Sequence, residues 1–213
     1  MAARSLESSI RTELRRSFAD QPPESPLAGP RTAAIALILL VEHGGEALEA
    51  LLIERATRDG DPWSGHMALP GGHAEPSDAD LAATAERETL EEVGLDLRAT
   101  GERLGRLSDC EPVRGVPVAV RPFVYLLDRR PTLTLSAEVR CGLWVPTLPL
   151  QRGEHRATHT FNRAGRDLEF PAWDVDGKKV WGLTYRVLDE FFRRFNAVLG
   201  PESELLDNSR QSR

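Results

Sequence analysis

The chain has 213 residues, of which 40% are hydrophobic and 28% are charged, as in a soluble globular domain with a sizeable core. Its formal net charge of −6 argues against a nucleic-acid partner, which requires a basic surface. The two cysteines, Cys110 and Cys141, do not form a C-x-x-C zinc motif, and a chain of this size needs no structural disulfide.

The N-terminal 30 residues lack the apolar core of a signal peptide because Arg, Glu and Asp interrupt them. The longest apolar run, residues 33–41, is much shorter than the roughly 20 residues of a membrane span. We therefore expect a cytoplasmic protein with no membrane partner. The sequence leaves the oligomeric state open between monomer and homodimer.

Residues 6–18 predict the first helix. Apolar side chains recur there at positions 6, 10, 14 and 18, which places them on one helical face. This helix could dock on the domain, pair with a partner chain or stay disordered, and we favour docking. A proline-rich linker at residues 20–30 ends the segment.

A β-hairpin follows. Residues 32–41 form a continuous apolar run that is typical of a strand buried on both faces. Residues 43–45 predict a turn, and residues 48–55 predict the returning strand.

A glycine pair, a polar loop and an acidic helix come next, in residues 71–95. Ser77 or Asp78 is the expected N-cap of the helix, and Gly94 is the expected stop. Leu81, Ala85, Thr89 and Val93 recur every four residues and predict a buried stripe.

Three carboxylates border this stripe. Glu88, Glu91 and Glu92 are spaced i, i+3 and i+4, so they repel one another on one side of the helix. Arg87 can neutralise only one of these charges, whereas a divalent cation such as Mg²⁺ or Mn²⁺ would neutralise more. The plainer alternative is a solvated acidic helix face.

The same stretch resembles a known family motif. Residues 87–95 read RETLEEVGL, which is similar to the second half of the Nudix box, R-E-U-x-E-E-x-G-U, where U is apolar. Residues 70–72, PGG, resemble the opening of the box. Two departures stand out: the loop to Arg87 is one residue longer than the common form, and Thr89 is only half apolar. Both departures resemble the coenzyme A-cleaving branch of the family.

The resemblance implies an α/β fold of the Nudix type, an α/β/α sandwich with a central mixed sheet. It also implies a hydrolase of nucleoside diphosphates linked to another group, with Mg²⁺ or Mn²⁺ as the cofactor. The metal ligands would be Glu88, Glu92, Glu91 and the carbonyl of Gly71. Glu88 and Glu91 would also take part in catalysis, and Arg87 would orient the glutamates.

Four further residues are candidates for contacting the substrate. Arg55 and Arg58 precede the glycine motif, where they could bind phosphate, although surface charges are the plainer interpretation. His66 could contact the substrate or simply close its loop. Gly72, like Gly71, allows close approach of the backbone to a ligand.

The rest of the chain predicts more strands and a final helix. Glu138 is a further acid that could reach the metal site or remain an ordinary exposed residue. Residues 181–184, WGLT, resemble the passage that opens the last helix in the coenzyme A branch, and Trp173 or Trp181 could stack on adenine. The expected strands are residues 101–107, 118–127, 136–145, 167–173 and 178–181.

We thus predict a helix and linker at residues 1–30, a Nudix hydrolase domain at 31–199 and a polar, disordered tail at 200–213. The first-choice reaction cleaves coenzyme A or acyl-coenzyme A to 3′,5′-ADP and 4′-phosphopantetheine or its acyl form. Alternatives are ADP-ribose, NADH, dinucleoside polyphosphates or oxidised nucleotides as substrates, and a non-catalytic nucleotide-sensing module. In each case the partner is a small nucleotide.

Overall fold

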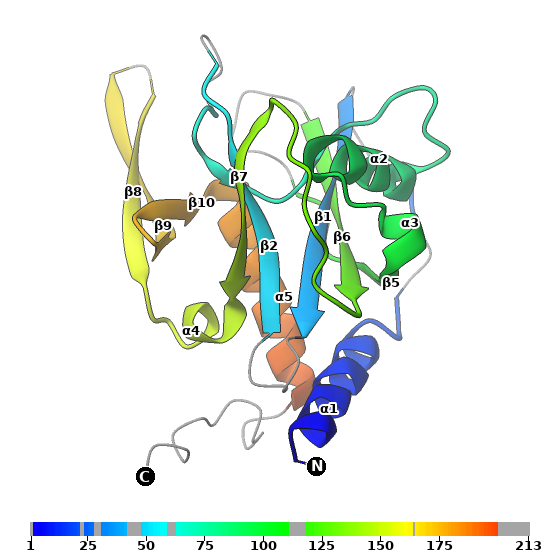
Figure 1. Cartoon of the computed structure of the whole chain (residues 1–213). Coiled ribbons are helices and arrows are strands. Elements are labelled where there is room, and N and C mark those ends of the chain that lie inside the picture. The colour runs from blue at the N-terminus through cyan, green and yellow to red at the C-terminus, as the bar shows by residue number, and fades with distance from the viewer. Residues whose placement is uncertain are drawn as a thin grey trace.

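The computed structural model describes residues 2–21, 24–27, 31–41, 48–58, 63–110, 118–163 and 165–199. Within these ranges, a seven-stranded mixed sheet has helices on both faces, and a three-stranded sheet lies beside it (Figure 1). The α/β/α sandwich predicted from the sequence is therefore confirmed.

The elements alternate along the chain. The helices are α1 (Ala2–Ser17), α2 (Leu81–Val93), α3 (Leu97–Thr100), α4 (Thr147–Gln151) and α5 (Gly182–Leu199). The strands are β1 (Arg31–Val41), β2 (Leu48–Arg55), β3 (Met67–Ala68), β4 (Gly71–His73), β5 (Gly101–Arg106), β6 (Val118–Leu127), β7 (Val139–Pro146), β8 (Arg156–Arg163), β9 (Arg166–Val175) and β10 (Lys178–Trp181).

Strand β1 is the centre of the sheet. It runs parallel to β6 along almost its whole length and pairs antiparallel with β2 only over residues 39–41. At its other end, residues 33–35 pair instead with β4. Because β1 and β2 part there, the glycine turn of residues 71–72 is built into the sheet itself.

The two faces of β1 bury different helices. Leu37 and Leu39 belong to a core that includes side chains of α1 and α5, whereas Ile38 and Leu40 belong to a core that includes side chains of α2. All four side chains are at most 2% exposed. This alternation explains why the strand is apolar at consecutive positions, as a strand covered on both faces must be.

Helix α1 docks on the domain, as favoured from its sequence. Ile10, Leu14 and Phe18 are buried in the core that also contains side chains of α5. The guanidinium of Arg15 makes two hydrogen bonds with the carboxylate of Glu102 on β5, at 2.8 and 2.7 Å. The helix begins at Ala2, four residues before the predicted start.

Most of the other predicted elements are confirmed, and four were missed. The strands expected at residues 101–107, 118–127, 136–145, 167–173 and 178–181 correspond to β5, β6, β7, β9 and β10. The sequence interpretation did not anticipate α3, α4, β4 or β8. The first three have too few residues for a periodic signal, and β8 was left unassigned although polar residues alternate with apolar ones along it.

Some predictions fall on residues that the structure does not describe. The turn at residues 43–45 and the tail at 200–213 lie outside the described ranges. The division of the chain at residues 30 and 199 stays a prediction. No helix in the described ranges is long and apolar enough to span a bilayer.

Candidate active site

Helix α2 begins two to three residues later than its sequence suggested. Its N-cap is Asp80, whose carboxylate accepts a hydrogen bond from the backbone N–H of Ala83 at 2.8 Å. The prediction of Ser77 or Asp78 as the cap was wrong. The Asp78 carboxylate is occupied elsewhere: it accepts hydrogen bonds from the Thr84 hydroxyl at 2.9 Å and from the backbone N–H of Glu75 at 2.9 Å.

The predicted stripe of α2 is confirmed. Ala85, Thr89 and Val93 are fully buried. The buried hydroxyl of Thr89 donates a hydrogen bond to the carbonyl of Ala85 at 2.7 Å. Gly94 ends the helix in the left-handed conformation, with φ of 69°. Packing of this stripe fixes the rotation of the helix and therefore the direction of its glutamates.

Glu92 lies under the glycine turn. Its side chain is buried, and its carboxylate accepts a hydrogen bond from the backbone N–H of Gly71 at 2.9 Å. Burial is the main cause that raises the pKa of Glu92 to about 7; the hydrogen bond from Gly71 opposes this rise, and the nearby charge of Glu88 adds to it. A carboxylate held in this way favours a cation beside it.

Glu88 lies against the second glycine. A Cβ atom on Gly72 would be 2.5 Å from the carboxyl carbon of Glu88, so any side chain at residue 72 would displace this carboxylate from its position. Burial also raises the pKa of Glu88, although Arg87 opposes that shift. The two glycines thus bring the backbone against two neighbouring carboxylates.

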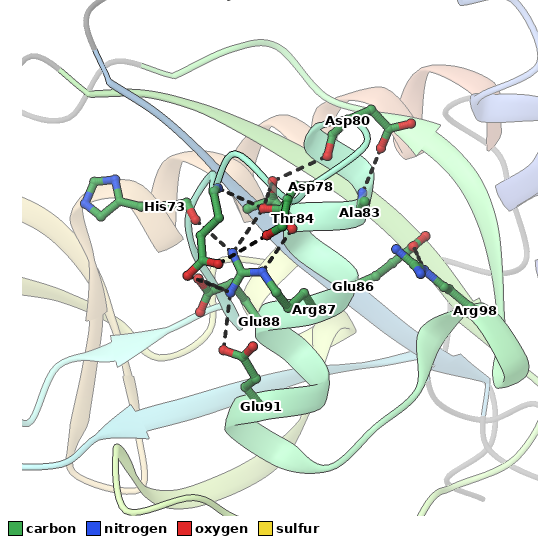
Figure 2. A network of polar contacts seen from close by, with 12 residues as sticks. His73, Asp78, Asp80, Ala83, Thr84, Glu86, Arg87, Glu88, Glu91 and Arg98 are labelled. Carbon is green, nitrogen blue, oxygen red and sulfur yellow. Dashed lines mark hydrogen bonds and ion pairs between the residues drawn. The ribbon is translucent and has the colours of Figure 1, made fainter.

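Arg87 is the hub of the polar network in Figure 2. Its guanidinium donates to both oxygens of Asp78, at 3.0 and 3.1 Å, and to the carbonyl of His73 at 2.9 Å. It also pairs with Glu88 at 3.0 Å and Glu91 at 3.2 Å. The arginine therefore ties α2 to the loop before it and fixes Glu88, which agrees with a role in orienting glutamates.

The other candidate residues lie around this centre. Arg55 is near enough to Glu92 to lower the pKa of that carboxyl, and Glu138 is near enough to raise the pKa values of both Glu88 and Glu92. Arg58 forms an ion pair with Glu138 at 3.0 Å. Glu138 therefore reaches the edge of the site, and Arg58 lies beside it.

His66 lies among aromatic rings. Its imidazole meets Trp181 edge to face, with ring centroids 5.1 Å apart, and it meets His159 at 5.9 Å. Its carbonyl accepts a hydrogen bond from the backbone N–H of Arg55 at 3.1 Å. This bond connects the rings to the carboxylates of Glu88 and Glu92, which we call the carboxylate centre.

The donor set suits a hard divalent cation, because such ions take carboxylate and carbonyl oxygens. A buried carboxylate, Glu92, and a partly buried one, Glu88, both with raised pKa values, lie beside a turn that requires glycine at residue 71. In the described ranges, however, no three acidic, histidine or cysteine side chains form a ready metal site. One reason is that Glu91 is 59% exposed and pairs with Arg87. Glu88, Glu92 and the turn at Gly71 fit the cation, and Glu91 would have to turn towards it.

The sequence interpretation missed two features near the site. Asp78 anchors Arg87, but its distance of nine residues is not a helical spacing and gave no signal. The aromatic rings of Trp63 and Phe161 lie parallel to each other beside His66, with centroids 6.1 Å apart. The alternation of His159 and Phe161 with polar residues in β8 was the signal that could have revealed this second feature.

Comparison with known proteins agrees with this geometry. The model of the NUDIX domain matches residues 30–161, more than half of the chain. The chain therefore belongs to the Nudix family. A solved MutT/nudix family protein from Enterococcus faecalis shares the fold, with a TM-score of 0.51 over 89% of this chain and 74% of that protein, at 19% identity.

Curated relatives are similar over most of the chain. The peroxisomal coenzyme A diphosphatase ndx-8 of Caenorhabditis elegans is 34% identical over 66% of this chain and 58% of its own length. The mitochondrial coenzyme A diphosphatase NUDT8 of Homo sapiens is 32% identical over 77% of this chain and 69% of its own. An uncharacterised protein of Schizosaccharomyces pombe is 34% identical over 68% of this chain. The chain spans only 50% to 58% of three of its curated relatives.

The ion pair of Asp78 predicts a pH-dependent contribution to stability. Arg87 lowers the pKa of Asp78 from 3.8 to about 2, so the pair stabilises the folded state above pH 4 and loses this effect as the pH falls through about 2. Asp78→Asn should lower the free energy of unfolding by about 2 kcal/mol at pH 7, measured in urea. Asp80→Asn is the control, because asparagine caps a helix as well as aspartate. Equal stability of Asp78→Asn and wild type at pH 7 would contradict the assignment.

The two glycines should respond differently to alanine. A Cβ on Gly71 would lie 2.3 Å from the carbonyl oxygen of Ala34 at a φ of 147°, so Gly71→Ala should destabilise the fold by about 2 kcal/mol or more. At Gly72 the Cβ meets only the end of the Glu88 side chain, which can move. Gly72→Ala should therefore unfold near the wild-type temperature in calorimetry. A greater loss for Gly72→Ala than for Gly71→Ala would reverse this interpretation.

Proposed function

We propose that the chain is a divalent-metal-dependent hydrolase that cleaves the diphosphate of coenzyme A or acyl-coenzyme A. The products would be 3′,5′-ADP and 4′-phosphopantetheine or its acyl form. The observation that carries the hydrolase proposal is the pair of carboxylates held against the Gly71–Gly72 turn, Glu92 buried and Glu88 partly buried. The coenzyme A part is supported by two relatives named as coenzyme A diphosphatases and by the longer loop before Arg87.

In this proposal, some residues around the turn bind the metal ion and another positions them. Glu88, Glu92 and the carbonyl of Gly71 would hold Mg²⁺ or Mn²⁺, with Glu91 as a further ligand. When bound, the cation would supply Lewis acidity, which neutralises charge on the diphosphate and acidifies water. Arg87 would keep Glu88 in place through its hydrogen bonds to Asp78.

Attack of water on phosphorus also needs a group that accepts a proton. Glu91 and Glu138 are the candidates, because both are more than half exposed at the edge of the site. Arg58 pairs with Glu138, so a bound diphosphate would compete with Glu138 for this guanidinium. Arg55, near Glu92, and the backbone of Gly72 would contact phosphate oxygens.

Other Nudix reactions remain as alternatives. ADP-ribose, NADH, dinucleoside polyphosphates and oxidised nucleotides carry the same diphosphate, which the carboxylate centre alone cannot distinguish. A nucleotide-sensing module without catalysis is a lesser alternative, since Glu88, Glu91 and Glu92 are all present. The absence of nucleic-acid and membrane partners, the monomer or homodimer state and the cytoplasmic location stay predictions; the names of three relatives place those proteins in peroxisomes, mitochondria and chloroplasts.

Glu92→Gln tests the metal role through two opposite effects. Turnover should fall by about two orders of magnitude or more, because a ligand is lost. The pKa of Glu92 is about 7 in the folded state and 4.5 as an ordinary carboxyl, so its ionisation lowers the stability of the fold as the pH rises from 4.5 through 7. The substitution removes this effect, and the metal-free variant should be more stable than the wild type by about 2 kcal/mol at pH 8. Glu91→Gln is the stability control, since that side chain is mostly exposed. Unchanged turnover of Glu92→Gln would refute the metal role.

A substrate panel tests the proposed specificity. Coenzyme A, acetyl-coenzyme A, ADP-ribose and NADH would each be incubated with Mg²⁺ or Mn²⁺ and the products read by mass spectrometry. We expect 3′,5′-ADP and 4′-phosphopantetheine from coenzyme A. Cleavage of ADP-ribose without cleavage of coenzyme A would overturn the first choice and leave the hydrolase proposal intact.

A further inference from the structure

The three-stranded sheet carries aromatic side chains on the face opposite the one that packs on α5. Its inner face packs on α5, where Trp173 stacks on Tyr185 with ring centroids 4.2 Å apart. Along β8, Thr158 and Thr160 on the Trp173 side of the sheet are exposed and polar, as a solvated face normally is. The opposite side is partly buried and carries His159, Phe161 and Phe170, with Trp181 from the neighbouring strand.

The strand register places these side chains on one face. His159 is opposite Phe170, and Phe161 is opposite Leu168, across the β8–β9 pair. Residues that are directly opposite in an antiparallel pair share a face. Trp181 joins this face, because its ring stacks on His159 with centroids 4.0 Å apart.

The loop before β3 adds two more rings to this face. Trp63 lies parallel to Phe161, with an interplanar angle of 7° and centroids 6.1 Å apart, and His66 meets Trp181 edge to face. We call this set the aromatic face: Trp63, His66, His159, Phe161, Phe170 and Trp181.

Part of the aromatic face is open to solvent. Trp63 is 39% exposed, and Leu168 on the same side of the sheet is 38% exposed. These are two of the four large hydrophobic side chains that are most exposed in the described ranges. Exposed apolar side chains gathered on one surface indicate a binding surface rather than a core.

The aromatic face is continuous with the carboxylate centre. The backbone of Arg55 is hydrogen-bonded to His66 at 3.1 Å and to Gly65 at 3.1 Å, and Arg55 acts electrostatically on Glu92. The strand after His66 leads directly into the Gly71 turn. A ligand whose diphosphate lies at the glutamates can therefore extend towards Trp63.

We propose that the aromatic face binds the purine base of the nucleotide substrate, by stacking on Trp63 and Phe161. The surface consists of ring faces, which suit a flat heteroaromatic group, and stacking on such rings does not depend on a particular base. The imidazole of His159, which is partly buried on this face, adds polar atoms beside the rings. The assignment extends the proposed function by identifying what recognises the part of the substrate that is not cleaved.

The test compares ADP with inorganic diphosphate, which lacks the base, by calorimetric titration of the full chain in Mg²⁺. Trp63→Ala should weaken ADP binding about 10-fold or more, with diphosphate binding unchanged. Phe161→Ala should act in the same direction, and Trp63→Phe should retain most of the affinity. Leu135→Ala is the matched control, because Leu135 is also 39% exposed but lies off the aromatic face.

Each outcome decides the assignment separately from the reaction. Wild-type affinity for ADP in Trp63→Ala, or failure of the wild type to bind ADP more tightly than diphosphate, would overturn the aromatic face as a base site. Loss of affinity for palmitoyl-4′-phosphopantetheine alone would assign the face to an acyl chain and also overturn it. If coenzyme A is not cleaved but Trp63→Ala still binds ADP more weakly than the wild type does, the substrate proposal fails and the base site stands.

Discussion

The repulsion between Glu88 and Glu92 is the constraint on which the site depends. Glu92 is buried and Glu88 partly buried on one side of the helix, and removal from water raises both pKa values. The fold tolerates this because Arg87 donates to Glu88 and the Gly71 N–H donates to Glu92. These contacts offset only part of the charge, and we propose that a bound cation would offset the rest. In this proposal some stability is given up for function, as active sites commonly require.

The sheet provides the rigidity that this arrangement needs. Because β1 parts from β2 and pairs with β4, the glycine turn is held by backbone hydrogen bonds rather than by a free loop. The buried stripe of α2 then fixes the glutamates relative to that turn. Fixed donors and charges are more effective than mobile ones, since no reorganisation is needed when the substrate binds.

The sequence predicted the parts of the molecule whose signals are local. The continuous apolar run of β1, the stripe of α2 and the i, i+3, i+4 spacing of the glutamates each reflect a single element. Contacts between elements were harder to predict. Asp78 was mistaken for a cap because its partner, Arg87, becomes a neighbour only after the loop folds back. The aromatic face combines residues of four separate segments, so no single stretch displayed it.

The most direct test of the account is the position of manganese in crystals of the wild-type protein grown with MnCl₂ and inorganic diphosphate. The account predicts an anomalous difference peak between the carboxylates of Glu88 and Glu92 and the carbonyl of Gly71. The absence of a peak there, with diphosphate bound, would contradict the claim that these glutamates are gathered to hold a metal ion.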